Sequence, residues 1–212
     1  MSASSSDKIN RIISFLFRIY GDIDWWKAEC ADEIIIGAIL TQATRWKNVE
    51  SSLDILKELN LCRISSIHAS DAETIESAVK SSGFYRQKTA RLKACAACIM
   101  EESGGVEALS GYNTDLLRDR FLSVKGIGEE TADSILCYAL DRPSFVIDAY
   151  TKKICTCAGI TGNYSDLKRL FEEVLPAGAG TYRQVHAHMV EYAKGYCQKR
   201  RCQECWIRNL NV

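Results

Sequence analysis

The organisation of this chain is set by residues 122–150, which read LSVKGIGEETADSILCYALDRPSFVIDAY. A helical pattern ends near Val124, two glycines follow at Gly126 and Gly128, and a second helical pattern begins near Glu129. Two helices joined by such a short turn present backbone N–H groups at the positive N-terminus of the second helix. The pattern therefore predicts a site that can hold one phosphate.

A single acid follows this second helical pattern. Asp148 is flanked by the apolar residues Val146, Ile147 and Ala149. Burying a carboxylate in such surroundings is unfavourable unless the group is paired or used in chemistry. Together with the phosphate-binding turn, this acid indicates an enzyme that acts on nucleic acid.

The composition is that of a soluble globular protein, with 212 residues of which 47% are hydrophobic and 25% charged. This length allows one compact domain or two small lobes. No apolar run approaches the roughly 20 residues that span a bilayer, and the N-terminus lacks the apolar core of a signal peptide. We therefore expect a cytoplasmic protein, nucleoid-associated if prokaryotic, with no membrane partner.

The net charge is zero, but its distribution is uneven. Residues 83–95 carry four basic side chains and no acid, and residues 194–208 carry five against one acid. Each run could be a solvated helix face. Beside a phosphate-binding turn, the two runs favour DNA as a partner.

Ten cysteines without a secretory signal argue against a disulfide framework. Cys95 and Cys98 form a C-x-x-C inside a helical pattern and are interpreted as buried small residues.

The pattern is helical throughout and predicts an all-α fold. Asp7 is expected to cap the first helix, and residues 31–41 are apolar enough for a central buried helix. Residues 45–59 are amphipathic, with Leu59 among the residues expected to face inward.

With these residues in view, the chain resembles the helix-hairpin-helix (HhH-GPD) DNA glycosylases. Within them it looks most like the endonuclease III-related branch that includes 3-methyladenine DNA glycosylase III. The matching segments are Asp24–Trp26, Gly37–Trp46, Ser82–Lys88 and the opening stretch through Asp148.

The resemblance implies two helical lobes. One is a six-helix module at about residues 28–141, and the other joins residues 1–27 to residues 142–212. It also implies a monomer that binds double-stranded DNA containing a damaged or mispaired base. The base would flip out of the helix, because the glycosidic bond is inaccessible inside the stack.

Asp148 matches the family's catalytic aspartate, which would stabilise positive charge on the sugar and orient or deprotonate water. Asp148 can also serve as a helix N-cap, and both roles are compatible. Glu130 occupies the position where bifunctional members carry a lysine that forms a Schiff base. Lys125 lies on the other side of the glycines. The resemblance therefore implies a monofunctional glycosylase, with the role of Glu130 open.

Aromatic residues are expected to form the base pocket. Trp46 matches a position that packs on the flipped base, and Trp25 or Trp26 could supply the opposite face, which would favour cationic alkylated purines. Alternatively, Trp46 is ordinary core and the Trp pair plugs the interface between the lobes. Tyr150 either lines the pocket or is buried in the second lobe.

Other matched positions imply DNA contacts. Gln42 would bond to the orphaned partner base, Phe84 would replace lost stacking, and Lys88 would contact a backbone phosphate. In the hairpin, the expected DNA-binding residues are Lys125, Gly126, Gly128 and Thr131.

Cys197, Cys202 and Cys205 resemble the superfamily's cluster-binding loop, but a [4Fe–4S] cluster takes four thiolates, and the fourth would fall near Asn211. Either a nonstandard ligand completes a cluster, or the loop persists without one as a basic DNA-contacting tail. Zinc bound with His186 or His188 is disfavoured, since both are expected on the preceding helix.

The main hypothesis is a DNA glycosylase of base excision repair that hydrolyses an N-glycosidic bond, with alkylated purines such as 3-methyladenine as substrate. One alternative is an endonuclease III-like glycosylase and abasic-site lyase for oxidised pyrimidines or mismatches. Another is a non-catalytic DNA-binding helix-hairpin-helix module.

Overall fold

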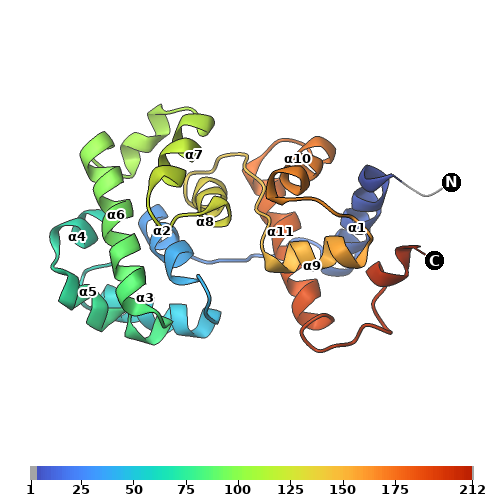
Figure 1. Cartoon of the computed structure of the whole chain (residues 1–212), viewed down its shortest axis with the longest axis horizontal. Helices are drawn as coiled ribbons and strands as arrows, with labels where there is room; N and C mark the ends of the chain where they lie inside the picture. Colours follow the sequence, from blue (N-terminus) through green and yellow to red (C-terminus); the bar gives the residue numbers. More distant parts are fainter. Residues whose placement is uncertain (1–3, 212) are drawn as a thin grey trace. The chain divides into compact units, whose positions relative to one another are not determined.

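The computed structural model describes residues 4–211, and helices are the only regular secondary structure in that range. The predicted all-α fold class is therefore confirmed. The chain divides into two compact units. Residues 28–141 form one, called here the contiguous unit, and residues 1–27 with 142–212 form the other, called the split unit. In Figure 1 the contiguous unit runs from light blue to yellow, and the split unit combines the dark blue helix with the orange and red ones.

The contiguous unit is built around α2, whose apolar residues Ile35, Ile36, Ile39 and Leu40 are fully buried. Helices α3 and α6 and the α8–η3 segment pack against it. The elements are α2 (Ala31–Leu40), α3 (Trp46–Glu58), α4 (Ile64–Ala69), α5 (Ala72–Ala78), η1 (Lys80–Ser82), α6 (Tyr85–Ser103), η2 (Glu107–Gly111), α7 (Thr114–Ser123), α8 (Glu129–Ser134) and the π-helical η3 (Ile135–Ala139).

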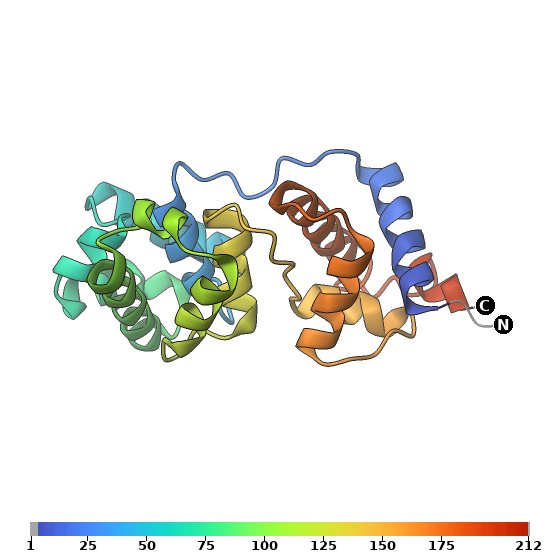
Figure 2. The same cartoon turned by 90° about the horizontal axis from the view of Figure 1, so that it is seen from above.

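The split unit joins the two ends of the chain. Its elements are α1 (Ser5–Tyr20), α9 (Ala149–Cys157), α10 (Tyr164–Val174), α11 (Ala179–Gly195) and η4 (Ile207–Asn211). The apolar side of α1, with Ile9, Ile12 and Leu16 buried, packs against α10 and α11. Figure 2 shows α1 in blue running alongside these helices. None of the helices in the described range combines the length and apolarity needed to cross a membrane.

Two local expectations were wrong. The cap of α1 is Ser4, whose hydroxyl accepts from the amide of Asp7, while the Asp7 carboxylate accepts from the amide of Ser4. Asp7 is thus the third residue of a capping box rather than the cap itself. Leu59 lies just past the end of α3 and is 50% exposed, because the helix stops before its side chain can reach the core.

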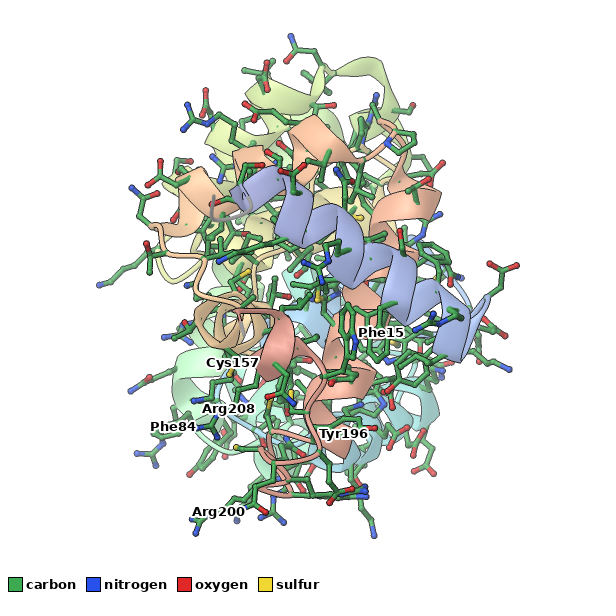
Figure 3. All side chains as sticks on the ribbon, turned by 90° about the vertical axis from the view of Figure 1, so that its right-hand side faces the viewer. Phe15, Phe84, Cys157, Tyr196, Arg200 and Arg208 are labelled. Atoms are coloured by element: carbon green, nitrogen blue, oxygen red, sulfur yellow. The ribbon has the colours of Figure 1, made fainter. Side chains whose placement is uncertain are left out.

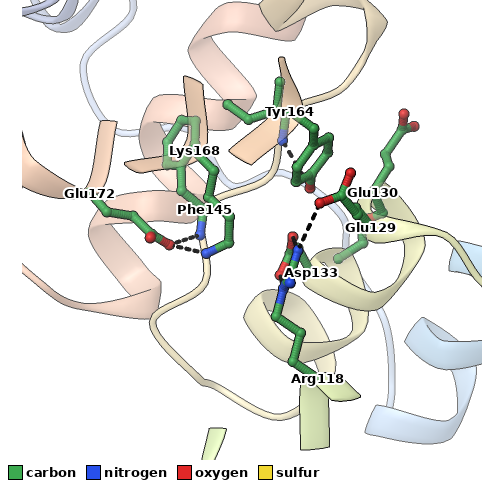
Figure 4. A network of polar contacts seen from close by, with 10 residues as sticks. Arg118, Glu129, Glu130, Asp133, Phe145, Tyr164, Lys168 and Glu172 are labelled. Carbon is green, nitrogen blue, oxygen red and sulfur yellow. Dashed lines mark hydrogen bonds and ion pairs between the residues drawn. The ribbon is translucent and has the colours of Figure 1, made fainter. Parts of the chain in front are cut away.

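A buried ion pair holds the helices on either side of the hairpin. Arg118 on α7 donates from Nε to Oδ1 of Asp133 (2.9 Å) and from Nη2 to Oδ2 (3.1 Å), and Asp133 on α8 is completely buried. Figure 4 shows this pair with Glu129, which lies 3.4 Å from the same guanidinium. A bidentate bond of this kind fixes the orientation of the two helices around the turn.

We expect Arg118→Met to lower the free energy of unfolding by about 3–5 kcal/mol, because it leaves the Asp133 carboxylate buried without its guanidinium. Urea denaturation monitored by circular dichroism measures this. Arg169→Met is the control, since Arg169 is 71% exposed and pairs only at the surface with Asp166 and Glu173. An equal effect of the two substitutions would contradict the role of the buried pair.

Candidate functional site

The turn between α7 and α8 is a tight hairpin with an exposed tip. The amide of Ile127 donates to the carbonyl oxygen of Val124 (3.0 Å), and the buried Ile127 side chain anchors the turn. Lys125, Gly126 and Gly128 are exposed. Gly128 is the N-cap of α8 and offers no side chain, so a ligand can approach the backbone closely at this helix end.

A network of side-chain hydrogen bonds supports the hairpin. Arg91 on α6 donates to Oε1 of Gln42, and Nε2 of Gln42 donates to the carbonyl oxygen of Gly126 (3.2 Å) and to Oγ1 of Thr131 (2.9 Å). Thr131 is buried, and its expected role in DNA binding stays a prediction. Gln42 was expected to bond to an orphaned base. In this structure its amide positions the hairpin instead.

The burial of Lys88 contradicts the expectation that this lysine contacts a DNA phosphate. The Lys88 side chain is completely buried, and its Nζ donates to the carbonyl oxygens of Leu40 (2.7 Å) and Ser82 (2.6 Å). Burial, and to a lesser extent the charge of Arg91, lower the pKa of Lys88 to about 8. This lysine ties together two turns of the contiguous unit.

Two large aromatic residues of the contiguous unit are open to solvent. Phe84 is 64% exposed and has a left-handed backbone (φ 45°) at the start of α6. Trp46 is 38% exposed at the first position of α3, so it is not a core residue. Both are accessible enough for the base-stacking roles that the resemblance implies. Those roles remain predictions.

Glu130 is exposed in the first turn of α8, two residues after Gly128. Its backbone carbonyl accepts a hydrogen bond from the hydroxyl of Ser134 (2.7 Å). The exposed side chain at this position is a carboxylate and not an amine.

Asp148 is the N-cap of α9, and its Oδ1 accepts from the amide of Thr151 (2.7 Å). Its Oδ2 lies 3.6 Å from Nε2 of His186, and both side chains are largely buried. Burial alone would raise the pKa of Asp148. The interactions with His186 and Thr151 outweigh that effect, so the pKa lies below its ordinary value. The site thus holds an ionised carboxylate in a largely dehydrated place.

Trp25 also contacts His186. Its ring meets the His186 ring edge-on (5.5 Å, 79°) and meets Trp26 in the same way (6.3 Å, 87°). Gln184, two residues before His186 on α11, holds the segment before Trp25 through two hydrogen bonds with the backbone of Ile23 (2.8 and 2.7 Å). His186 therefore contacts both Trp25 and Asp148 within the split unit.

His186 and Gln184 were missed in the sequence as parts of this group, since His186 was considered only as a zinc ligand. Both lie on α11, which α10 separates from α9 along the chain. No local motif marks them. The contact of a buried histidine with Asp148 is visible only after the helices pack.

The C-terminal segment after α11 is anchored on the split unit by aromatic contacts. Tyr150 is half-buried and its hydroxyl is bonded to Gln198. Trp206 stacks on Phe15 (4.0 Å, 15°), and Tyr192 stacks on Tyr196 (4.4 Å, 24°). Phe15 and Tyr196 are labelled in Figure 3. Tyr150 thus connects α9 to this segment.

The three cysteines of this segment lie in different surroundings. Cys202 is exposed, Cys197 is half-buried, and Cys205 is buried with its Sγ bonded to the hydroxyl of Tyr192 (3.4 Å). Within the described part of the chain, no three His, Cys, Asp or Glu side chains form a group that could hold a metal ion. The side chain of Asn211 lies outside the described residues.

Comparisons with known proteins place the chain among DNA repair proteins. A model described as HhH-GPD superfamily base excision DNA repair protein matches residues 36–177. A Methanocaldococcus jannaschii protein, provisionally named a DNA repair glycosylase, is 39% identical and aligned over 99% of this chain and 98% of its own.

Solved structures share the fold. H. pylori 3-methyladenine DNA glycosylase (MagIII), bound to 1,N6-ethenoadenine, has a TM-score of 0.79 and 27% identity, over 91% of this chain and 98% of its own. Endonuclease III in a non-covalent DNA complex also has a TM-score of 0.79, with 16% identity, over 99% of this chain and 96% of its own.

We expect Gly126→Ala to destabilise the hairpin by about 1–3 kcal/mol. Gly126 has φ +91°, and a Cβ there would lie 2.6 Å from Nε and 2.7 Å from Cγ of Arg91. Gly128→Ala is the matched control, because nothing lies within 4 Å of its Cβ and its φ is −96°. Chemical denaturation of both variants measures the difference. Equal stabilities would argue against the strained backbone and close contact at Gly126.

Proposed function

The chain belongs to the HhH-GPD superfamily of base excision DNA repair proteins, and we propose that it is a monofunctional glycosylase that removes a flipped, damaged base by hydrolysis. The resemblance inferred from the sequence is confirmed by the family match and the relatives. The observation that carries the proposal is the buried Asp148 carboxylate, kept ionised beside His186 at the start of α9.

In this reaction the bond between base and sugar breaks as positive charge develops on the sugar. A carboxylate fixed in a poorly hydrated site stabilises that charge strongly, because few water dipoles screen it. The Thr151 amide fixes Oδ1 of Asp148, and Oδ2 faces His186. Asp148 would therefore stabilise the sugar cation and orient or deprotonate the attacking water.

Alkylated purines such as 3-methyladenine are the proposed substrates. Such bases are cationic, and aromatic faces attract them through cation–π interactions. Trp46 is exposed on the contiguous unit, and Trp25 adjoins the His186–Asp148 pair of the split unit, so each is taken separately as a candidate for stacking on a base. MagIII, which is 27% identical, is named for 3-methyladenine and was solved with bound 1,N6-ethenoadenine. Both are modified purines, which supports the same substrate class.

Double-stranded DNA with a damaged or mispaired base is the proposed partner. The hairpin tip offers exposed backbone at Gly126 and Gly128 with Lys125 beside it, which suits a DNA phosphate. Phe84 projects an exposed ring from a braced loop and would fill the gap in the base stack. Gln42 would contribute to DNA binding indirectly, because it holds the hairpin through Gly126 and Thr131.

Glu130 supports hydrolysis without strand cleavage. A lyase needs an amine that attacks the sugar and forms a Schiff base. Glu130 is an exposed carboxylate at the position of that amine, so it cannot form this intermediate. No specific observation favours the endonuclease III-like lyase or the non-catalytic module over this proposal.

We also propose that the C-terminal segment keeps its fold without a [4Fe–4S] cluster. Its contacts are those of ordinary packing: Trp206 on Phe15, Cys205 against Tyr192, and Ile207 completely buried. Arg200 and Arg208, labelled in Figure 3, are exposed on this segment and would contribute positive charge toward DNA.

Asp148→Asn should reduce base release by on the order of 100-fold or more, because the amide carries no charge. Asparagine caps helices as well as aspartate does, so the fold and DNA affinity should remain. Since the pKa of Asp148 is lowered, activity of the unmodified protein should persist as the pH falls, until it passes that lowered pKa. Single-turnover assays on a panel of lesion duplexes measure this. Full activity of the variant would refute the assignment.

Borohydride reduction during turnover should trap no covalent protein–DNA adduct, because Glu130 offers no amine. The measurement is gel electrophoresis of labelled DNA, with strand nicking scored separately from base release. A bifunctional endonuclease III treated in parallel provides the positive control. A trapped adduct would establish a lyase and overturn the monofunctional proposal.

Anaerobically purified protein reconstituted with iron and sulfide should show no visible absorbance of an iron–sulfur cluster. Cys202→Ser should leave the melting temperature unchanged, since this thiol is exposed. Trp206→Ala should lower the free energy of unfolding by about 2 kcal/mol through loss of the contact with Phe15. Stoichiometric iron and sulfide, lost on Cys202→Ser, would contradict the proposal.

A further inference from the structure

The buried ammonium of Lys88 joins two turns that are far apart in sequence. It lies on α6 and donates to Leu40, the last residue of α2, and to Ser82 in η1. The last carbonyl groups of a helix have no partner within that helix, and positive charge is favourable there. Lys88 therefore satisfies the end of α2 and the end of η1 at the same time.

The segment that Lys88 holds leads directly into Phe84. Ser82 is followed by Gly83 (φ 71°) and then by Phe84 (φ 45°, ψ 34°), so two consecutive residues have left-handed backbones. Such a conformation is strained for phenylalanine and persists only when its surroundings enforce it. The amide of Lys88 also donates to the Phe84 carbonyl (3.0 Å). That second contact is the ordinary backbone bond that starts α6, so the side chain of Lys88 holds the segment through Ser82, just before Gly83.

The other turn leads into Gln42. Leu40 is followed by Thr41, whose hydroxyl bonds back to Gly37 (2.7 Å), and then by Gln42, which Arg91 holds from the next turn of α6. Lys88 and Arg91 are three residues apart and share one side of the helix. One face of α6 therefore sets the Phe84 loop and the Gln42 turn together.

We propose that Lys88 is a positioning residue that holds the exposed Phe84 ring ready to enter the base stack when a damaged nucleotide flips out. This inference rests on the proposed function of the chain. Lys88 does not touch DNA or the reacting atoms. It acts through the carbonyl groups of Leu40 and Ser82, and it is needed only while a base pair must be opened.

Lys93 provides a matched control on the same helix. Its Nζ donates to the carbonyl oxygens of Ile67 (3.2 Å), His68 (2.7 Å) and Ser70 (2.7 Å), around the end of α4. Lys93 therefore makes the same kind of contact as Lys88, but at a turn that carries neither Phe84 nor Gln42. Lys93→Met removes a structural ammonium without disturbing the proposed wedge.

The test compares base release from two substrates in single-turnover reactions. Each carries the lesion that the unmodified protein releases fastest, placed either in a paired duplex or in an unpaired bulge. Lys88→Met should slow the duplex reaction by about tenfold or more, since small displacements of a positioned group have large effects on rate. It should leave the bulge reaction nearly unchanged, and Lys93→Met should preserve the ratio of the two rates.

A double-mutant cycle links Lys88 to Phe84. Phe84→Ala should show the same duplex-selective loss, and the double variant should be no slower than Phe84→Ala alone, because both act through one ring. Additive losses, or equal losses on duplex and bulge, would overturn the proposal. If Lys88→Met does not fold, Lys88→Gln serves in the same assay with the same expected selectivity, because its shorter, uncharged side chain holds the two carbonyl groups less firmly.

A second readout separates this proposal from the proposed function. 2-Aminopurine placed next to the lesion brightens when the duplex opens, whether or not a base is released. Lys88→Met should weaken that signal while Lys93→Met leaves it intact. If the unmodified protein opens the duplex but releases no base from any lesion, the glycosylase proposal fails and the Lys88 result still stands. An unchanged signal in Lys88→Met would refute the positioning role.

Discussion

A chain made of short helices must satisfy many helix ends, because the first four N–H groups and the last four C=O groups of each helix lack partners within it. This chain meets the requirement with side chains. Helices α5, α7, α9 and α10 are capped at their N-termini by Asp71, Asn113, Asp148 and Asn163. Lysines from α6 satisfy carbonyl groups at the ends of α2 and α4. The N-cap of the hairpin helix α8 is a glycine without a side chain, as is that of α11. The glycine-capped end of α8 is the one proposed to bind DNA.

Asp148 shows how one side chain meets two demands. As a cap it must accept a hydrogen bond from the Thr151 amide, and in its proposed catalytic role it must stay charged although it is largely buried. The same amide bond that caps α9 also favours the ionised form, as does His186. Burial opposes ionisation but strengthens the field that the charge exerts on a nearby sugar. The cap therefore helps to maintain the charge that the chemistry requires.

The sequence predicted the fold class, the family and most helix positions because local periodicity and ordered motifs determine them. The glycines of the hairpin and Asp148 were found in one continuous stretch. Lys88 was misjudged because it lies in a basic run, and nothing local distinguishes a buried lysine from an exposed one. His186 was missed because its contact with Asp148 depends on how α11 packs on α9. Residues whose roles depend on tertiary contacts were thus beyond prediction from the sequence alone.

The division of the chain into two units also sets the order in which its parts can fold during synthesis. The contiguous unit can complete its core once residue 141 has left the ribosome, whereas α1 must wait for α10 and α11. Throughout that interval Ile9, Ile12 and Leu16, buried in the finished protein, have no partner helix to cover them. Exposed apolar surface of this kind promotes aggregation and recruits chaperones. Helix α1 is therefore synthesised well before the helices that cover it, and its apolar side is the part of the split unit that stays unprotected for longest.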